Sequence, residues 1–330
     1  MTRAAVLSAG SWGTAFAQVL ADAGCDVLLY ARRPEIADAI NAGENPAYLP
    51  GIALPGRVKA TTEPDVALAG ADIAVLSVPS QTLRANLAAW APLIGPGTVV
   101  VSLMKGIELG TGLRMSEVIA QNAALDPARV AVLSGPNLAR EIASRQPAAS
   151  VIACTDEAVG RRLQAACHTS YFRPYTHTDV IGCELGGAVK NVTALAVGLA
   201  AGLGLGDNAK ATLMTRGLAE TTRLGTALGA DPATFAGLAG LGDLTATCLS
   251  PLSRNRTFGE HLGRGLTVAE ATRATGQTAE GAKSAYSVLD LARRHQVEMP
   301  ITEIVVAILD GQVTIDQAVD LLMTRSPRAE

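Results

Sequence analysis

The sequence predicts an α/β protein in which a doubly wound, mostly parallel sheet is followed by an all-helical domain. Short apolar runs alternate with helical patterns as far as His177. A glycine-containing turn joins the first apolar run to the first helix. Strand patterns stop at Thr178, and the later apolar segments have helical spacing. At 330 residues the chain is long enough for two cores, so we expect domains at residues 1–180 and 181–330.

The elements of the first domain follow from its apolar runs. Residues 4–7 form a short apolar run of the kind found in strands that are buried on both faces. Further strand candidates lie at residues 26–30, 58–61, 73–77, 98–102 and 130–134. Helical patterns lie between them at residues 15–23, 64–69, 81–90 and 111–122. Residues 148–154 and 171–176 predict edge strands around a helix at 156–168.

The second domain contains only helical patterns. They cover residues 184–202, 208–228, 231–238, 267–275, 279–295 and 314–323. Two polar segments between them, residues 240–248 and 253–256, are expected to be loops.

Composition restricts the class of partner. The formal net charge is −3 and the pI is about 5.9, which argues against nucleic acid or an anionic membrane as a main partner. The chain is 48% hydrophobic but only 3% aromatic, so Ala, Val and Leu must fill its cores. An anionic ligand therefore needs a local basic cluster.

Cysteine and histidine usage predicts a cytoplasmic protein with reduced thiols. The five cysteines and four histidines are scattered and form no metal-ligand motif, so no structural metal is expected. Two long uncharged runs, at residues 4–21 and 86–104, are interrupted by glycine, proline or polar side chains. We therefore expect no membrane segment.

The turn after the first strand has the features of a dinucleotide site. Residues 8–14 read Ser-Ala-Gly-Ser-Trp-Gly-Thr and lead into a helix. Strand, glycine turn and helix in this order form the Rossmann fingerprint, whose helix N-terminus binds a pyrophosphate through free N–H groups. Gly10 and Gly13 match the pattern, whereas Ser8 stands where the first of its three glycines is expected.

The second strand predicts which cofactor is used. It is followed by Ala-Arg-Arg-Pro, without the acid that would bond the ribose 2′-OH of NAD. Arginine pairs with a 2′-phosphate and stacks on adenine. Arg32 and Arg33 therefore predict that NADPH is preferred or accepted beside NAD. The alternative is that one of these arginines is merely solvated.

A lone lysine, Lys190, lies inside the apolar helical segment at residues 184–202. Burying an ammonium group costs roughly several kcal/mol unless it is paired. Helical spacing suggests that Glu184 and Asn191 lie beside it. The alternative is a lysine that extends from the edge of a core helix into solvent. A nucleotide site before Lys190 and an anion site after it favour a functional role.

Polar loops supply candidates for binding an anion. Lys105 directly follows a buried strand, and the loop at residues 135–141 follows another; ligands of such sheets gather at the carboxyl ends of the strands. Arg254 and Asn255 can offer a planar fork and an amide to a phosphate. The alternative for Ser253, Arg254 and Asn255 is a helix cap with a solvated arginine.

Taken together, these motifs resemble the bacterial NAD(P)-dependent glycerol-3-phosphate dehydrogenases over essentially the whole chain. The matching segments are GSWGT at 10–14, NPAYLPG at 45–51, KG at 105–106, GP at 135–136, GAVKN at 187–191, NAKA at 208–211, TRGLAE at 215–220, GLGDL at 240–244, TC at 247–248, SRN at 253–255, EG at 280–281 and PITE at 300–303. So many motifs in one order make chance agreement implausible.

The resemblance implies a cytoplasmic homodimer that reduces dihydroxyacetone phosphate to sn-glycerol 3-phosphate, the backbone precursor of phospholipids. The catalytic group it implies is Lys190 with Asn191, Asp243 and Thr247. The implied substrate contacts are Lys105, Gly135, Asn137, Lys190, Asp243, Ser253, Arg254 and Asn255. Cofactor contacts are expected from Gly10, Ser11, Trp12, Gly13, Arg32, Arg33, Lys105, Ala139, Arg254, Thr278 and Glu280.

The sequence departs from the family pattern at four positions. Ser8 replaces a glycine, Met104 a small residue, and Ala201 an aspartate; Asn137 stands where the family has Ser or Thr. Because an amide both donates and accepts hydrogen bonds, we expect Asn137 to alter affinity rather than abolish activity.

The expected chemistry is hydride transfer to the C2 carbonyl, with protonated Lys190 as hydrogen-bond donor and then general acid. Lys105 and Arg254 supply positive charge for the phosphate, and closure between the domains is expected. One rival is another hydroxyacid- or ketoacid-reducing dehydrogenase of the same build. The other is a non-catalytic NADPH-binding sensor. The basic pair favours a phosphorylated substrate, and Lys190 with Asp243 and Thr247 disfavours the sensor.

Overall fold

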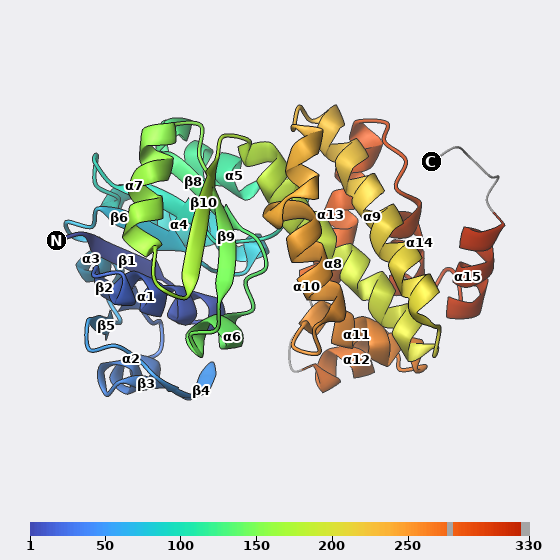
Figure 1. Cartoon of the computed structure of the whole chain (residues 1–330), viewed down its shortest axis with the longest axis horizontal. Coiled ribbons are helices and arrows are strands. Elements are labelled where there is room, and N and C mark those ends of the chain that lie inside the picture. The colour runs from blue at the N-terminus through green and yellow to red at the C-terminus, as the bar shows by residue number, and fades with distance from the viewer. Residues whose placement is uncertain (276–279, 325–330) are drawn as a thin grey trace. The chain divides into compact units, whose positions relative to one another are not determined.

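The computed structural model describes residues 1–275 and 280–324, and it divides the chain into two compact units. The first unit comprises Met1–Glu108 and Leu113–Glu184, and the second Leu109–Gly112 and Leu185–Glu330. Figure 1 shows a sheet flanked by helices in the first unit and an assembly of helices in the second. The predicted fold class is confirmed.

The described part of the first unit is built on an eight-stranded sheet of order β10-β9-β8-β7-β6-β1-β2-β5. These strands are β1 (Arg3–Leu7), β2 (Asp26–Tyr30), β5 (Val58–Thr61), β6 (Ile73–Leu76), β7 (Val99–Ser102), β8 (Val130–Ser134), β9 (Ala148–Ala153) and β10 (Phe172–His177). Neighbours are parallel except β8 and β9, which are antiparallel. In the sheet β2 lies on one side of β1 and β6 on the other, so the direction in which strands are added reverses at β1. This is the switch point at which such sheets bind ligands.

Both faces of the sheet are covered, which explains the uninterrupted apolar runs of the strands. Ala4 and Val6 of β1 belong to one core cluster, and Ala5 and Leu7 to the other, because successive side chains point to opposite faces. The first cluster includes residues of α1 (Ser11–Asp22), α2 (Pro34–Asn41) and α7 (Glu157–Cys167). The second includes residues of α3 (Pro64–Leu68), α4 (Leu83–Trp90) and α5 (Met115–Ala123).

Several short elements of the first unit were not predicted. They are α2, the hairpin of β3 (Glu44–Asn45) and β4 (Leu49–Ala53), α6 (Ala139–Ala143), and the 3₁₀ turns η1 (Ser80–Thr82), η2 (Ala91–Leu93) and η3 (Pro127–Arg129). Each is too short for a clear period, and proline or glycine interrupts the hairpin. Such elements are defined by tertiary contacts rather than by their own pattern.

Two predicted elements of the first unit need correction. The helix expected at 111–122 begins at Met115, because Arg114 is its N-cap and the Arg114 amide donates to Glu117 Oε2 at 2.9 Å. The strand at 148–153 is not an edge: β9 lies between β8 and β10, and β10 is the edge strand. Pro174 is tolerated in β10 because an edge strand has one unpaired side.

The second unit consists of helices around α8 (Val180–Gly202), whose first turn belongs to the first unit. The others are α9 (Asp207–Ala227), α10 (Asp243–Leu249), α11 (Arg254–Gly263), α12 (Val268–Ala274), α13 (Glu280–Arg294), α14 (Pro300–Leu309) and α15 (Ile315–Met323), with a 3₁₀ turn η4 (Pro232–Ala236) and a π-helical turn η5 (Leu238–Gly242). The helix expected at 231–238 is thus the 3₁₀ turn η4, and α14 was not predicted. α8 is long and apolar enough to cross a membrane, but 94% of its most apolar window is buried inside the protein. It is a core helix.

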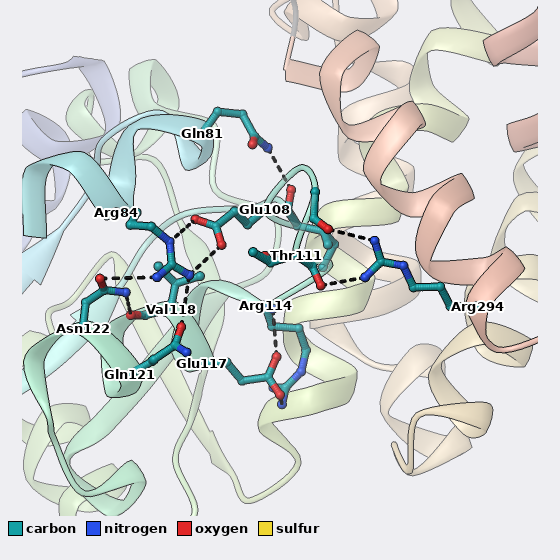
Figure 2. A network of polar contacts seen from close by, with 12 residues as sticks. Gln81, Arg84, Glu108, Thr111, Arg114, Glu117, Val118, Gln121, Asn122 and Arg294 are labelled. Atoms are coloured by element: carbon teal, nitrogen blue, oxygen red, sulfur yellow. Dashed lines mark hydrogen bonds and ion pairs between the residues drawn. The ribbon is translucent and has the colours of Figure 1, made fainter.

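The segment between β7 and α5 is held by two arginines (Figure 2). In the first unit, Arg84 donates to both carboxylate oxygens of Glu108 at 2.8 Å. In the second unit, Arg294 of α13 donates to the carbonyl oxygens of Gly110 and Thr111, each at 2.8 Å. Leu109–Gly112 therefore belongs to the second unit, although the chain on either side of it belongs to the first.

Candidate active site

The ammonium group of Lys190 is paired inside the second unit. Its Nζ donates to Asp243 Oδ1 at 2.5 Å and to Thr247 Oγ1 at 2.6 Å. Lys190 is 8% exposed and Asp243 is 1% exposed. Asp243 and Thr247 lie four residues apart on α10, so one face of that helix presents both oxygens to the lysine. Lys190 is therefore a buried, charge-paired group and not a lysine that extends into solvent.

The acid beside Lys190 is not the one expected from helical spacing. Glu184 accepts hydrogen bonds from Arg114 Nη1 at 2.7 Å, from the Ser116 amide at 2.8 Å and from Ser116 Oγ at 2.6 Å. It thus ties the start of α8 to the start of α5. A step of six positions, from Glu184 to Lys190, turns an α-helix through about 600°, which leaves the two side chains well apart around the axis.

A π-helical turn delivers Asp243 to Lys190. The prediction of a loop at 240–248 is wrong, because η5 continues directly into α10 at Asp243. A Cβ added to Gly240 would lie 2.1 Å from the carbonyl oxygen of Phe235, and one added to Gly186 of α8 would lie 2.4 Å from that of Ala239. Glycine at 186 lets the turn pack directly against α8, and glycine at 240 lets the turn fold back against Phe235 of η4. Such π turns are frequent at functional sites.

Asn191, the residue after Lys190, is linked to two other helices. Asn255 Nδ2 donates to Asn191 Oδ1 at 2.9 Å, and Asn255 Oδ1 accepts from the Gly281 amide at 2.9 Å. A Cβ on Gly281 would lie 2.7 Å from the Asn191 carbonyl oxygen, so only glycine fits there. The structure therefore brings α8, α11 and α13 together at the two predicted asparagines.

The segment at 253–255 is the start of helix α11, so the prediction of a loop at 253–256 is also wrong. Ser253 is the N-cap of α11, and its Oγ accepts from the Arg256 amide at 3.3 Å. Ser253 is buried, whereas Arg254, the first residue of the helix, is exposed. The helix-cap alternative thus holds for Ser253, and it places the Arg254 guanidinium beside the positive end of a helix dipole.

The turn between β1 and α1 has the glycine geometry of a dinucleotide turn. Gly10 is the N-cap of α1, which has no side-chain cap. A Cβ on Gly10 would meet only Ser8 Oγ, at 3.6 Å, whereas a Cβ on Gly13 would lie 2.4 Å from both the Ser8 carbonyl oxygen and Ser77 Oγ. Gly13 thus permits close packing of helix on strand, and Gly10 leaves the N–H groups of the first turn accessible. Buried Trp12 Nε1 has no hydrogen-bond partner among the described residues.

Ser8 adopts a backbone conformation that favours glycine. Its φ is +148°, which explains why the fingerprint has glycine at this position. The Gly10 amide donates to Ser8 Oγ at 3.4 Å, so the hydroxyl gives the strained residue one local contact.

The two arginines after β2 have different surroundings. Arg32 is exposed and makes no side-chain hydrogen bond or ion pair within the described part of the chain. Arg33 lies 3.5 Å from Glu35 Oε1, donates to the Tyr48 hydroxyl at 3.4 Å and has its guanidinium 5.9 Å from the centre of the Tyr48 ring. Arg33 is therefore partly occupied by protein groups, and Arg32 is the better placed of the two to meet a phosphate.

Lys105, Gly135 and Asn137 are brought together at the carboxyl ends of β7 and β8. Lys105 Nζ donates to the Gly135 carbonyl oxygen at 2.8 Å. Asn137 Nδ2 donates to Ser150 Oγ at 3.1 Å, and that hydroxyl donates to the Ser134 carbonyl oxygen at 2.9 Å. Ser150 is fully buried, and sequence reasoning missed it. The antiparallel pairing of β8 with β9 brings it there, which no local pattern reveals.

The other predicted cofactor contacts lie at the start of α6 or near the gap in the described residues. Ala139 is the first residue of α6. Thr278 lies outside the described residues, as does the side chain of Glu280. All five cysteines are free and buried. Burial raises the pKa of the Cys248 thiol to about 12, although the Lys190 charge opposes that shift.

Two family models cover most of the chain. The model described as NAD-dependent glycerol-3-phosphate dehydrogenase N-terminus matches residues 3–160, and that described as the C-terminus of the same enzyme matches residues 179–320. The chain belongs to the NAD-dependent glycerol-3-phosphate dehydrogenase family. The match spans both the dinucleotide turn and the Lys190 cluster.

Curated members of the family are similar over their full length. The glycerol-3-phosphate dehydrogenase [NAD(P)+] of Streptomyces griseus subsp. griseus is 68% identical over 329 residues, which cover 99% of this chain and 98% of the relative. That of Thermobifida fusca is 65% identical over 332 residues, covering 100% and 99% of the two chains. The crystal structure of glycerol-3-phosphate dehydrogenase from Coxiella burnetii is 40% identical, with a TM-score of 0.93 over 98% of this chain and 99% of that chain.

More distant structures share the fold alone. D-mandelate dehydrogenase in a complex with NADH is 14% identical with a TM-score of 0.64, covering 97% of this chain and 100% of that one. A ketopantoate reductase from Ralstonia eutropha is 19% identical with a TM-score of 0.60, covering 97% and 100%. The fold therefore does not exclude the rival hydroxyacid and ketoacid dehydrogenases; family membership does.

Proposed function

We propose that this chain catalyses the reversible NAD(P)H-dependent reduction of dihydroxyacetone phosphate to sn-glycerol 3-phosphate and so supplies the backbone of glycerophospholipids. Full-length identity of 68% to a glycerol-3-phosphate dehydrogenase [NAD(P)+] supports the reaction. The observation that carries it in this chain is the pairing of buried Lys190 with Asp243 and Thr247. A non-catalytic sensor would have no use for a buried ammonium group held in this way.

Lys190 is the general acid of the reduction in this proposal. An ammonium group has three N–H donors; Asp243 and Thr247 accept two of them, and the third is directed to the C2 carbonyl oxygen of the substrate. As hydride adds to C2, the carbonyl electron pair moves to oxygen, which takes a proton from Lys190 and leaves a neutral amine. The Asp243 carboxylate holds the ammonium in place. In the reverse direction the neutral amine accepts that proton.

The dinucleotide is held, in our proposal, mainly by the β1–α1 turn. Room above Gly10 and the uncapped start of α1 fit a pyrophosphate. When bound, NADPH or NADH supplies the hydride. Exposed Arg32 favours a 2′-phosphate, with Arg33 next to it. The full set of proposed contacts is Gly10, Ser11, Trp12, Gly13, Arg32, Arg33, Lys105, Ala139, Arg254, Thr278 and Glu280.

The substrate phosphate requires positive charge that the chain as a whole lacks. We propose Lys105 and Arg254 as its source. Lys105 follows β7 and is held at the carboxyl ends of the strands by the Gly135 carbonyl oxygen, and Arg254 lies at the start of α11, where the helix dipole favours an anion. Asn137, Ser253 and Asn255 supply further polar contacts, and Asn191 positions Asn255. Residues 1–180 then form the dinucleotide-binding domain and residues 181–330 the substrate and catalytic domain.

The assembly and its location are part of the same proposal. We infer a cytoplasmic homodimer without membrane insertion, since α8 is buried as a core helix. The homodimer is the assembly that the family resemblance implies. Light scattering on purified protein tests it, and a mass equal to one chain would contradict the homodimer.

The deciding experiment is a turnover assay. Oxidation of NADPH is followed with dihydroxyacetone phosphate and, separately, with unphosphorylated dihydroxyacetone, and both are repeated with NADH. Turnover confined to the phosphorylated ketone is expected. Equal turnover of the two ketones would remove Lys105 and Arg254 from phosphate binding. Tight NADPH binding without any turnover would reject the reaction.

A further inference from the structure

Asn45 is a fully buried amide that belongs to none of the proposed contact sets. It lies in β3, at the start of the NPAYLPG segment, and is 0% exposed. Burying an amide is costly unless hydrogen bonds compensate. Its partners therefore indicate what the residue does.

The partners of Asn45 lie in the dinucleotide turn. Its Nδ2 donates to the Ala9 carbonyl oxygen at 3.0 Å and to Thr14 Oγ1 at 2.9 Å. Thr14 Oγ1 in turn donates to the same Ala9 oxygen at 3.2 Å. Three buried groups thus form a closed triangle that joins the hairpin, the turn and the first turns of α1.

A second bond and an apolar contact join the same hairpin to α1. Ser11 Oγ donates to the Tyr48 carbonyl oxygen at 2.9 Å. Leu49, which is 2% exposed, packs in one cluster with Ala15 of α1. The hairpin therefore contacts the β1–α1 turn and the start of α1 through Asn45, Tyr48 and Leu49. Asn45 is the only buried polar side chain of the hairpin.

The turn needs such support because its own backbone is strained. Ser8 has φ +148° and lacks the conformational freedom of glycine. A pyrophosphate is bound by N–H groups of this turn only if they converge before the ligand arrives. Fixing the Ala9 carbonyl fixes the orientation of the Ala9–Gly10 peptide, whose N–H belongs to the turn and has only a long contact, 3.4 Å, with Ser8 Oγ.

We propose that Asn45 is a positioning residue for the pyrophosphate of the dinucleotide, and that it acts through the Ala9 carbonyl and Thr14. It touches neither cofactor nor substrate in this role. The inference rests on the proposed dinucleotide binding, but it does not depend on which ketone is reduced. Its effect should therefore appear in binding of any ligand with a pyrophosphate and be absent for ligands without one.

The test compares variants of the triangle by ligand titration without ketone. Asn45→Ala and Thr14→Val are each expected to raise the Kd of NADPH and of ADP-ribose about tenfold. A change of this size corresponds to the net contribution of about one hydrogen bond. Adenosine 2′-monophosphate, which has no pyrophosphate, should bind all variants within about twofold, since its affinity reports only the adenosine end. Thr14→Ser keeps the hydroxyl and should restore wild-type affinity.

A second asparagine of the same unit, which is exposed, provides a control that separates positioning from stability. Asn41 bonds the Ala60 amide and carbonyl groups in the same unit, at 2.9 and 3.1 Å, and lies away from the turn. Asn41→Ala should lower the melting temperature without changing the Kd of ADP-ribose. If Asn45→Ala behaves like Asn41→Ala, the proposal is wrong. If Asn45→Ala does not fold, the comparison of Thr14→Val with Thr14→Ser decides. Equal affinity of these two variants for ADP-ribose would overturn the proposal.

The same variants distinguish this inference from the proposed reaction. The double variant Asn45→Ala/Thr14→Val should have a Kd for ADP-ribose about tenfold above that of wild type, the same as each single variant. The effects do not add, because both changes break the same network. In the turnover assay, the KM for NADPH should rise while kcat and the KM for the ketone hold. A wild-type protein that binds ADP-ribose but reduces no ketone would reject the reaction and leave the Asn45 comparison intact.

Discussion

The carbonyl oxygen of Leu195 on α8 lies so close to Gly259 on α11 that a Cβ added to the glycine would be 2.1 Å from it. The reciprocal contact joins Gly198 of α8 to Arg256 of α11, where an added Cβ would lie 2.0 Å from the carbonyl oxygen. The two helices pack backbone against backbone. This close approach sets the start of α11, with Asn255, beside Asn191 and hence next to Lys190.

Gly259→Ala is expected to destabilise the second unit and to lower activity. A methyl group at this position forces the helices apart, and overpacking of this kind costs about 1–3 kcal/mol. Denaturant unfolding and kcat measure the two effects. Gly206→Ala is the control, because a Cβ on Gly206 meets no atom within 4 Å. Equal stability of the two variants would show that the helices can separate without cost.

Lys190→Met is expected to lower kcat by a factor of about 10²–10⁴, the usual contribution of a positioned general acid. The Kd of NADPH should not change, since Lys190 is not among the proposed cofactor contacts. Lys210→Met serves as the control: Lys210 forms a surface ion pair with Asp207 at 2.6 Å on α9. Both kcat and Kd are compared on folded protein. A kcat of Lys190→Met near that of the control would exclude Lys190 as the acid.

Arg254→Ala is expected to raise the KM for dihydroxyacetone phosphate by about 10- to 100-fold, because a charge-assisted bond to phosphate is lost. Arg256→Ala removes an arginine two positions along the same helix, which pairs with Glu260 at 3.3 Å. Steady-state kinetics on both variants make the comparison. Similar KM values would place the phosphate elsewhere.

Glu220 predicts a pH dependence of stability. It is 3% exposed and accepts from the Ile301 amide at 2.7 Å, at the start of α14. Burial raises the pKa of Glu220 from 4.5 to about 7. Because the folded state holds this proton more tightly, the stabilisation is present below pH 4.5 and is lost as the pH rises toward 7. The contribution is on the order of 3 kcal/mol.

The Glu220→Gln variant isolates this contribution. Its neutral amide keeps an acceptor for Ile301 but does not titrate, so the free energy of unfolding should fall less steeply between pH 5 and about 7 than in wild type. Unfolding at several pH values measures the slope. Parallel curves for the two proteins would show that Glu220 keeps an ordinary pKa in the folded state.

Local sequence patterns predict the layout of the fold and the location of the dinucleotide turn. Strands such as β1 and β8 are apolar on both faces and appear as continuous runs, so their positions follow from local composition. The turn at Gly10 and Gly13 is equally local, since strand, glycines and helix are adjacent in the chain. Lys190 was visible as a single charge in an apolar helix. All of these signals lie within one or two elements.

Which groups meet these residues depends on contacts between distant parts of the chain, and local patterns do not reveal it. The partners of Lys190 lie 53 and 57 residues further along the chain, and Glu184, only six positions away, bonds Arg114 instead. Asn45 reaches Thr14 across 31 residues, through a hairpin too short to predict. Periodicity specifies which face of an element is buried, but the neighbour that covers that face depends on how closely backbones can approach. At α8 and α11 glycines set that distance.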